Sequence, residues 1–234
     1  MEYKKLNKES TRVISNNDPY LQQTPDGKIT LKNKLSIFNH SELIEQENTL
    51  SISRSMEILN GEVTIPNGTP FEKVLFIHEY IFKDIYEWAG KLRKINISKG
   101  STRFAPIENF EELIKEFNKV ANNEEEIIFQ YNTYNIFHPF REGNGRAGRI
   151  WLINEFRKTL EKDLHFFKIK KDDYMQAMIS MDDQEIGVVI AKGKADLNLE
   201  NQHVNWGNLV ASHQYEGYYG DFDGQSLIYD TQPI

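Results

Sequence analysis

Cysteine is absent from the 234-residue sequence. Its absence excludes a disulfide, a thiolate metal site and a cysteine nucleophile, and it fits a reducing cytoplasm, where we expect the protein to act. Long apolar runs are absent as well, so we expect neither a membrane span nor a membrane partner. The N-terminal stretch MEYKKLNKESTRV is polar and charged, which is unlike a signal peptide.

The sequence also lacks an excess of basic residues. It has 28 lysine and arginine residues against 35 aspartate and glutamate residues, which gives a net charge of −7. A general nucleic-acid-binding protein needs a broad basic surface, so we expect no nucleic-acid partner. The residues are 39% hydrophobic and 12% aromatic, which is enough for a hydrophobic core, and the length fits one domain with additions.

The coarse pattern along the chain is helical. Turn-forming residues dominate residues 1–34, which we predict to be an irregular N-terminal arm. Asn39, a good helix N-cap, opens the first periodic segment. Alternation and β-branched residues around a Lys-Gly-Ser centre indicate a β-hairpin over residues 92–104. We predict helices over residues 39–59, 71–90, 108–120, 123–137, from about 144 to 162, 171–181, 183–194 and about 205–216.

The stretch HPFREGNGRAGR, residues 138–149, calls for a chemical explanation. Gly143 and Gly145 permit positive φ and a close approach of a ligand to the backbone, and Asn144 tolerates left-handed geometry. An apolar pattern typical of a helix follows. Backbone N–H groups would therefore gather at a helix N-terminus, which favours the binding of an anion.

The charged residues of this stretch sharpen that prediction. Arg146 and Arg149 lie three residues apart, which predicts that they share one face of the first turn of the helix. A cation there is unfavourable by roughly 0.3–1 kcal/mol unless an anion compensates it. Arginine forks suit phosphates, and Glu142 beside them indicates a bridging Mg²⁺. His138 can accept a proton near neutral pH. A packed histidine, an ordinary turn and solvated arginines would explain each feature singly, but their coincidence favours a site for nucleotide transfer.

The same stretch resembles the motif HPFx(D/E)GNGRxxR of Fic-domain proteins, with every specified position filled. NDPYL, LKNKL, DIYEWAGKLR, ISKG and TRFAP resemble the usual approach to a Fic core, so the resemblance covers about residues 16–195. It implies the mainly α Fic fold, a helical bundle with a small β-hairpin flap over the active site. It also implies transfer of AMP from ATP to a hydroxyl side chain of a target protein, with Mg²⁺ and release of pyrophosphate.

The resemblance assigns roles to individual residues. His138 would be the base that deprotonates the target hydroxyl, and Glu142 would ligate Mg²⁺. The nucleotide phosphates would be held by Gly143, Asn144, Gly145, Arg146 and Arg149, the last of them at the γ-phosphate. The flap would add a strand of the target to its edge through Ile95, Asn96, Ile97, Ser98, Thr102, Arg103 and Phe104.

A second motif lies near the C-terminal end, where ASHQYEGYYG places Ser212, Glu216 and Gly217 in the pattern S-x-x-x-E-G. This resembles the inhibitory motif (S/T)xxxE(G/N) of the self-inhibited Fic subgroup called class III. The resemblance implies that Glu216 pairs with Arg149 in place of the γ-phosphate. We therefore divide the chain into an N-terminal arm (1–34), a Fic core (35–197), an inhibitory helix (198–220) and a tail (221–234).

The expected function is that of a self-inhibited protein adenylyltransferase. The expected partners are ATP and a target protein with an exposed Tyr, Ser or Thr. Tyr215, Tyr218 and Tyr219 flank the inhibitory glutamate, so the chain itself is another candidate acceptor, and a homo-oligomer is left open. The alternatives are an enzyme that removes AMP with the same site, and a nucleotide-binding regulator or toxin-type interaction protein without turnover.

Overall fold

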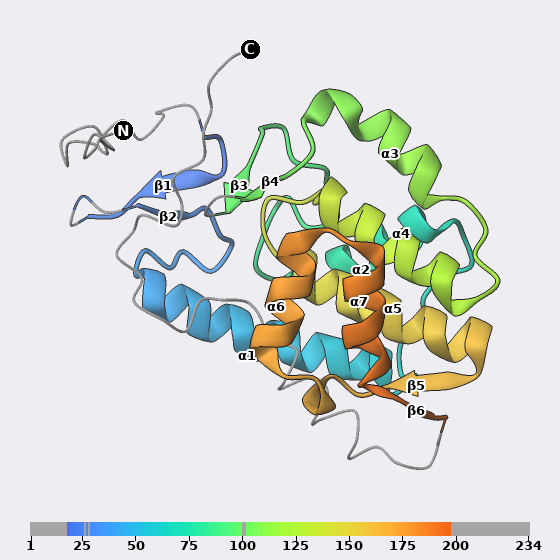
Figure 1. Ribbon diagram of the computed structural model, residues 1–234. Helices are drawn as coiled ribbons and strands as arrows, with labels where there is room; N and C mark the ends of the chain where they lie inside the picture. The colour runs from blue at the N-terminus through green and yellow to red at the C-terminus, as the bar shows by residue number, and fades with distance from the viewer. Residues whose placement is uncertain (1–17, 26, 28, 100–101, 198–234) are drawn as a thin grey trace.

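The computed structural model describes residues 18–25, 27, 29–99 and 102–197, and within them the prediction of a mainly α fold is confirmed (Figure 1). Three small antiparallel sheets pair β1 (Leu21–Gln23) with β2 (Ile29–Leu31), β3 (Ser98–Lys99) with β4 (Thr102–Arg103), and β5 (Lys162–Leu164) with β6 (Lys194–Asp196). The α-helices are α1 (His40–Leu59), α2 (Pro70–Phe82), α3 (Phe110–Phe117), α4 (Glu124–Phe137), α5 (Asn144–Leu160), α6 (Lys171–Ser180) and α7 (Asp183–Ala191).

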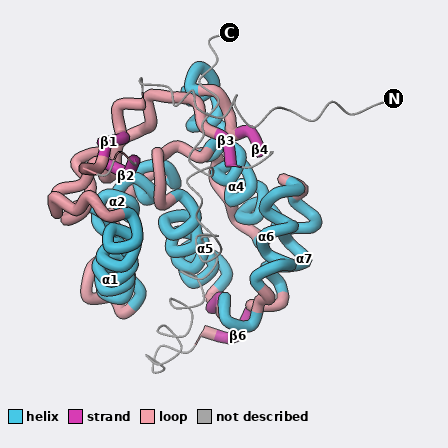
Figure 2. The backbone as a smooth tube through the Cα atoms, turned by 90° about the vertical axis from the view of Figure 1, so that its left-hand side faces the viewer, coloured by secondary structure: helices cyan, strands magenta, loops and turns pink. Residues whose placement is uncertain are grey.

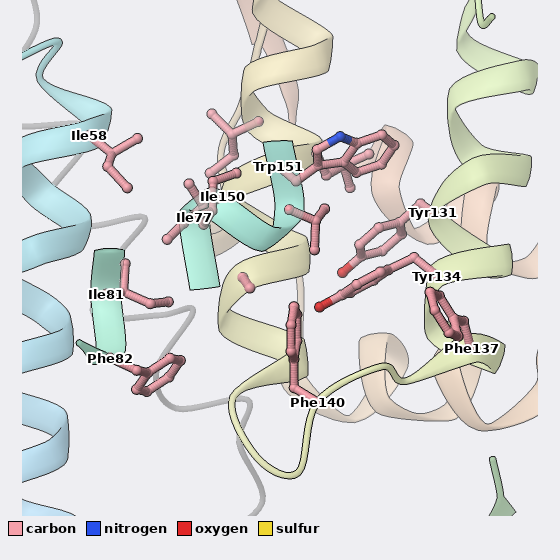
Figure 3. Packing of buried hydrophobic residues seen from close by; sticks show 14 of the residues in the cluster. Ile58, Ile77, Ile81, Phe82, Tyr131, Tyr134, Phe137, Phe140, Ile150 and Trp151 are labelled. Atoms are coloured by element: carbon pink, nitrogen blue, oxygen red, sulfur yellow. The ribbon is translucent and has the colours of Figure 1, made fainter. Parts of the chain in front are cut away.

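Helix α5 is the centre of the bundle. Figure 2 shows it between α1 and α2 on one side and α4, α6 and α7 on the other. It is buried nearly all round through its first half, as a helix with neighbours on every side must be. Tyr131 and Tyr134 of α4 direct their hydroxyl groups toward α5 (Figure 3). Gly148 of α5 is required at this contact, because a Cβ atom there would lie 2.5 Å from the Tyr134 ring.

Polar side chains cap most helix starts. Asn39 accepts the Glu42 N–H at 3.1 Å, as predicted. Helix α2 begins with a full capping box between Thr69 and Glu72, with Pro70 in the first turn. Asn123 and Asp182 cap α4 and α7 in the same manner. Among the described residues, no helix combines the length and apolarity that a bilayer span requires.

The predicted helix over residues 71–90 is wrong in its second half, because α2 ends at Phe82. Apolar residues continue beyond that point, but they lie in consecutive turns and not in a helix. Ile85, Tyr86 and Trp88 of these turns belong to the hydrophobic core. The segment closes at Gly90, whose φ of +71° is outside the helical range. Periodicity alone could not separate a buried turn from a buried helix.

The irregular arm predicted for residues 1–34 is wrong where the structure describes it. Strands β1 and β2 pair there, with Leu21 opposite Leu31, and Gly27 adopts a φ of +81° in the turn. Tyr20 and Leu31 join the hydrophobic core. Strands of three residues are too short to show an alternating pattern, so only the Asp-Gly turn was visible in the sequence.

The hairpin predicted over residues 92–104 exists but is shorter, since β3 and β4 contain two residues each. Strands β5 and β6 were not predicted. The helix predicted from residue 108 begins later, because residues 107–109 form a 3₁₀ helix and α3 starts at Phe110. The other helix ends either coincide with the predicted ones or differ by one to three residues, the scatter expected of boundaries read from sequence. The predicted helix at 205–216 lies outside the described residues.

Candidate active site

His138 is the C-cap of α4, in left-handed geometry with φ 46° and ψ 60°. Its backbone N–H donates to the Tyr134 carbonyl at 2.9 Å. Its ring Nδ1 lies 3.2 Å from the Asn135 carbonyl oxygen, which can only accept. Nδ1 must therefore carry the ring proton, which leaves the lone pair of the neutral imidazole on Nε2. The ring stacks on Phe104, with centroids 3.5 Å apart and planes 11° apart.

Asn144 holds the loop between α4 and α5 in shape. Its Oδ1 accepts the Phe140 N–H and its Nδ2 donates to the Phe140 carbonyl, both at 2.9 Å. The Tyr134 hydroxyl donates to the Asn144 carbonyl at 2.9 Å. The amide side chain, expected at the phosphates, thus braces the loop from within, and its contribution to an anion site would come through its backbone N–H.

Gly143 sets the start of α5. It has a φ of +80°, and an added Cβ atom would overlap the buried Phe82 ring, so only glycine fits at this position. No side chain caps the helix here. The N–H groups of Asn144, Gly145 and Arg146 belong to the first turn and have no acceptor within the helix, which is the arrangement that anion-binding helix termini use.

The positive charge of Arg146 is paired with a carboxylate that the sequence did not predict as its partner. Its Nη2 donates to Glu47 Oε1 of α1 at 2.5 Å, and its Nη1 donates to Ser51 Oγ at 3.3 Å. Its guanidinium carbon lies 4.6 Å from the centroid of the Phe82 ring. Tyr86 donates a further hydrogen bond to Glu47. Burial raises the pKa of the Glu47 carboxyl, and the neighbouring Arg146 opposes that rise.

Arg149 points to the other side of α5. It is 2% exposed, its Nη1 lies 3.5 Å from the Tyr174 hydroxyl of α6, and that hydroxyl lies 2.6 Å from the hydroxyl of Tyr131. The two arginines are three residues apart, yet one contacts α1 and the other α6. They therefore flank the N-terminus of α5 from opposite sides.

Glu142 fits the predicted Mg²⁺ in its chemistry. Its carboxylate accepts the Gly143 N–H at 3.0 Å and lies 3.9 Å from Arg146 Nη2, with 13% of the side chain exposed. No group of three or more metal-binding side chains occurs within the described part of the chain. Mg²⁺ needs no such group, because it binds through one or two carboxylates together with substrate phosphates and water.

His78 contacts the loop between α4 and α5, a supporting role that the sequence did not predict. The Gly90 N–H donates to its Nδ1, so its Nε2 carries the proton and donates to the Glu142 carbonyl, both at 2.9 Å. Its ring stacks on Phe140 at a centroid distance of 3.6 Å. Burial lowers the pKa of His78 from 6.5 to about 3. The ring is thus neutral in the folded protein at any ordinary pH.

Because His78 stays neutral in the folded protein, we predict that the free energy of unfolding decreases as the pH is lowered. The unfolded chain protonates His78 below about pH 6.5 while the folded protein does not until about pH 3, so stability is lost as the pH falls through that window. Between pH 7 and pH 5 this loss amounts to about 2 kcal/mol of unfolding free energy. Urea unfolding of the Mg²⁺-free protein should show it, and His78→Gln, which cannot titrate, should lose about 2 kcal/mol less. Equal pH dependence in the two proteins would contradict the assignment.

The predicted flap residues are only partly strand residues. Ser98 pairs with Arg103 across the hairpin. Ile97 is buried, and Asn96 Oδ1 accepts the Ile107 N–H at 2.9 Å, so these two anchor the hairpin to the body of the protein. Ile95, Thr102 and Phe104 are the remaining flap residues with described positions. The inhibitory-motif residues and the candidate acceptors lie outside the described residues: Ser212, Glu216, Gly217, Tyr215, Tyr218 and Tyr219.

Known sequences resemble this chain across the site. The sequence profile of the Fic/DOC family matches residues 69–155. The "Probable protein adenylyltransferase y4lH" of Sinorhizobium fredii is 31% identical over 170 residues, which cover 65% of this chain and 83% of the relative. The "Probable protein adenylyltransferase Fic" of Salmonella typhimurium is 30% identical over 149 residues, 57% of this chain and 70% of the relative. The match to "Protein adenylyltransferase VbhT" of Bartonella schoenbuchensis, 30% identical over 58% of this chain, spans only 30% of that relative's length.

Solved structures share the fold. The N-terminal Fic domain of an effector protein from Bartonella sp. AR 15-3 aligns with a TM-score of 0.63 at 20% identity, covering 74% of this chain and 90% of that domain. The BepC protein from Bartonella tribocorum, solved with bound AMPPNP, aligns with a TM-score of 0.62 at 20% identity, over 76% of this chain and 97% of that one. At this identity the likeness shows the fold alone.

Proposed function

The chain belongs to the Fic/DOC family, and from this premise we propose that it is an enzyme that transfers AMP from ATP to a hydroxyl side chain of a target protein. The observation that carries the proposal is the hydrogen bond of the His138 Nδ1–H to the Asn135 carbonyl. It leaves the proton-accepting lone pair on Nε2, at the mouth of a loop that ends in a helix N-terminus. The proposed base and the proposed anion site thus belong to one short segment.

In the proposed reaction, His138 Nε2 takes the proton of the target hydroxyl as its oxygen attacks the α-phosphorus of ATP. The new oxygen–phosphorus bond forms as the bond to the oxygen bridging the α- and β-phosphates breaks, and pyrophosphate leaves. The first-turn N–H groups of α5, with Arg146 and Arg149, would stabilise the phosphate charges. Glu142 would hold Mg²⁺, which when bound neutralises negative charge on the phosphates.

We assign the hairpin β3–β4 a role in presenting the target. The stack of Phe104 on His138 joins the hairpin to the base, so a segment paired with the hairpin edge would lie beside the reacting groups. Pairing of this kind uses the peptide backbone of the target and tolerates many sequences. A hydroxyl-bearing residue in an extended segment is the acceptor that this arrangement favours.

The proposal is tested on the chain itself and on cell proteins. The protein is incubated with ATP and Mg²⁺, alone and in a lysate, and peptides are searched by mass spectrometry for one added AMP on a hydroxyl. We expect modified target peptides, and the C-terminal tyrosines Tyr215, Tyr218 and Tyr219 are the first self-modification sites to inspect. Absence of AMP from every protein, in samples of both wild type and Glu216→Ala that bind ATP, would overturn the proposal.

We further propose that Glu216 restrains this activity, on the basis of the S-x-x-x-E-G match alone. If its carboxylate competes with the γ-phosphate for Arg149, Glu216→Ala should raise AMP transfer by about tenfold or more, equivalent to about 1.4 kcal/mol. Glu57→Ala is the matched control, since Glu57 ends another Ser-x-x-x-Glu pattern but bonds Arg54 and Tyr80 at the surface of α1. Equal rates for wild type and Glu216→Ala would reject the restraint.

A further inference from the structure

Arg93 stands out among the buried residues that the proposed reaction does not use. It is 2% exposed, and all of its described side-chain hydrogen bonds go to backbone carbonyls rather than to a carboxylate. Burial lowers the pKa of Arg93 to about 10, so the guanidinium keeps its charge at neutral pH. The bonds are Nε to the His138 carbonyl at 2.8 Å, Nη1 to Ile95 at 2.7 Å, and Nη2 to Ala105 at 2.5 Å and to Phe137 at 3.3 Å.

These four carbonyls belong to two different parts of the site. Ile95 and Ala105 lie just outside the two strands of the hairpin β3–β4. Phe137 and His138 form the C-terminal end of α4, where carbonyl groups lack helical partners and a cation is favourable. Two backbone bonds run beside the guanidinium: the Arg93 N–H donates to Pro139 at 2.8 Å, and the Ala105 N–H donates to Ile136 at 3.0 Å.

We propose that Arg93 is a positioning residue that locks the base of the hairpin to the backbone of His138, and so fixes the orientation of the His138 ring. Among the described contacts of the His138 side chain are the Nδ1–H bond to Asn135 and the stack on Phe104, which orient the ring. Phe104 belongs to the hairpin, and the backbone of His138 belongs to the helix end. The Arg93 side chain, together with the two backbone hydrogen bonds beside it, holds these two bodies in one register.

The geometry requires arginine. A guanidinium offers five N–H donors in a rigid plane, and here one such plane serves four acceptors on two segments. A lysine ammonium at this position would keep the charge at the helix end but has three donors and no fixed plane. Arg93→Lys therefore separates the positioning role from the charge.

The consequence for catalysis rests on the proposed function, but the positional effect can be measured without it. Nitrogen-15 spectra of the imidazole rings report which His138 nitrogen carries the proton. In wild type we expect the Nδ1–H form, and in Arg93→Lys a mixture of both forms. The control is Lys94→Ala, which removes an exposed cation from the next residue and should leave the wild-type spectrum.

In the transfer assay, the same loss of register should lower kcat while leaving the dissociation constant for ATP nearly unchanged. Misplacement of a reacting group by about 1 Å can cost about 10²-fold in rate, so kcat of Arg93→Lys should fall by roughly that factor. The dissociation constant for ATP should stay within about twofold, because the phosphate cradle lies on α5. A wild-type His138 spectrum in folded Arg93→Lys would overturn the inference. Absence of AMP transfer by both wild type and Glu216→Ala would reject the proposed function but would leave the positioning role of Arg93 standing.

Hydrogen exchange on wild type tests the lock even if Arg93→Lys does not fold. The N–H groups of Arg93, Ala105 and His138 are bonded to Pro139, Ile136 and Tyr134 respectively. If one lock holds them, their protection factors should agree within about tenfold. Exchange of the Ala105 N–H more than about a hundredfold faster than that of His138 would show that the hairpin opens independently, and the positioning role would be excluded.

Discussion

Replacing His138 with alanine is expected to lower the rate of AMP transfer by about 10²–10⁴-fold, the usual effect of removing a general base. The substitution removes the imidazole of His138, whose lone pair is placed on Nε2 by the hydrogen bond at Nδ1. It also removes the ring that stacks on Phe104. The measurement is the initial rate of label incorporation from α-labelled ATP at saturating ATP and Mg²⁺.

Binding of ATP provides the control for this prediction. The proposed phosphate contacts come from the first turn of α5 and from Arg146 and Arg149, none of which His138 touches through a described hydrogen bond. Calorimetry should therefore give nearly the same dissociation constant for His138→Ala as for wild type. Retention of more than half of the transfer rate by a variant that binds ATP normally would remove His138 from the role of base.

The second large effect is expected from Glu47→Ala, which should lower the free energy of unfolding by about 3–5 kcal/mol. Glu47 accepts hydrogen bonds from Arg146 and Tyr86 in the interior. Whatever the protonation state of the carboxyl, arginine cannot lose its charge. The substitution therefore takes a carboxylate partner from a buried cation, which is among the costliest single changes in a protein core.

Urea denaturation measures this loss. Glu45→Ala is the matched control, since it removes the same carboxylate from an exposed position two residues earlier in α1, and its effect should stay within about 0.5 kcal/mol. ATP affinity should fall in Glu47→Ala as well, because Arg146 would lose its orientation beside the phosphates. A change in unfolding free energy below about 1 kcal/mol would mean that Glu47 is not the counterion that holds Arg146.

The sequence was informative where a short segment carries its own chemistry. The positive φ of Gly143 and the helix that follows could be expected from residues 138–149, because turn and cap preferences are local. The left-handed residue is His138, whereas the sequence pointed to Asn144, which instead begins α5. The cap at Asn39 belongs to the same class. The fold class followed from periodicity together with the resemblance to a family.

The supports of the site could not be predicted in this way. His78 contacts Glu142, 64 residues away, Arg93 contacts His138, 45 residues away, and Glu47 contacts Arg146, 99 residues away. Two of these three contacts go to backbone carbonyls, which every residue has, so no side-chain pattern marks the partner. Strands of two or three residues likewise leave no period to detect, which is why β1, β2, β5 and β6 were missed.

The central claim is that this site transfers AMP, and the position of the label in ATP tests it most directly. Parallel reactions with α-labelled and γ-labelled ATP, each with Mg²⁺ and lysate, should be run for wild type, Glu216→Ala and His138→Ala. Labelling is counted above that of lysate without the added protein. The account predicts such covalent protein labelling from α-labelled ATP alone, increased in Glu216→Ala and lost in His138→Ala. Added labelling from γ-labelled ATP would instead show phosphate transfer, and added labelling that persists in His138→Ala would place the chemistry elsewhere; either result contradicts the account.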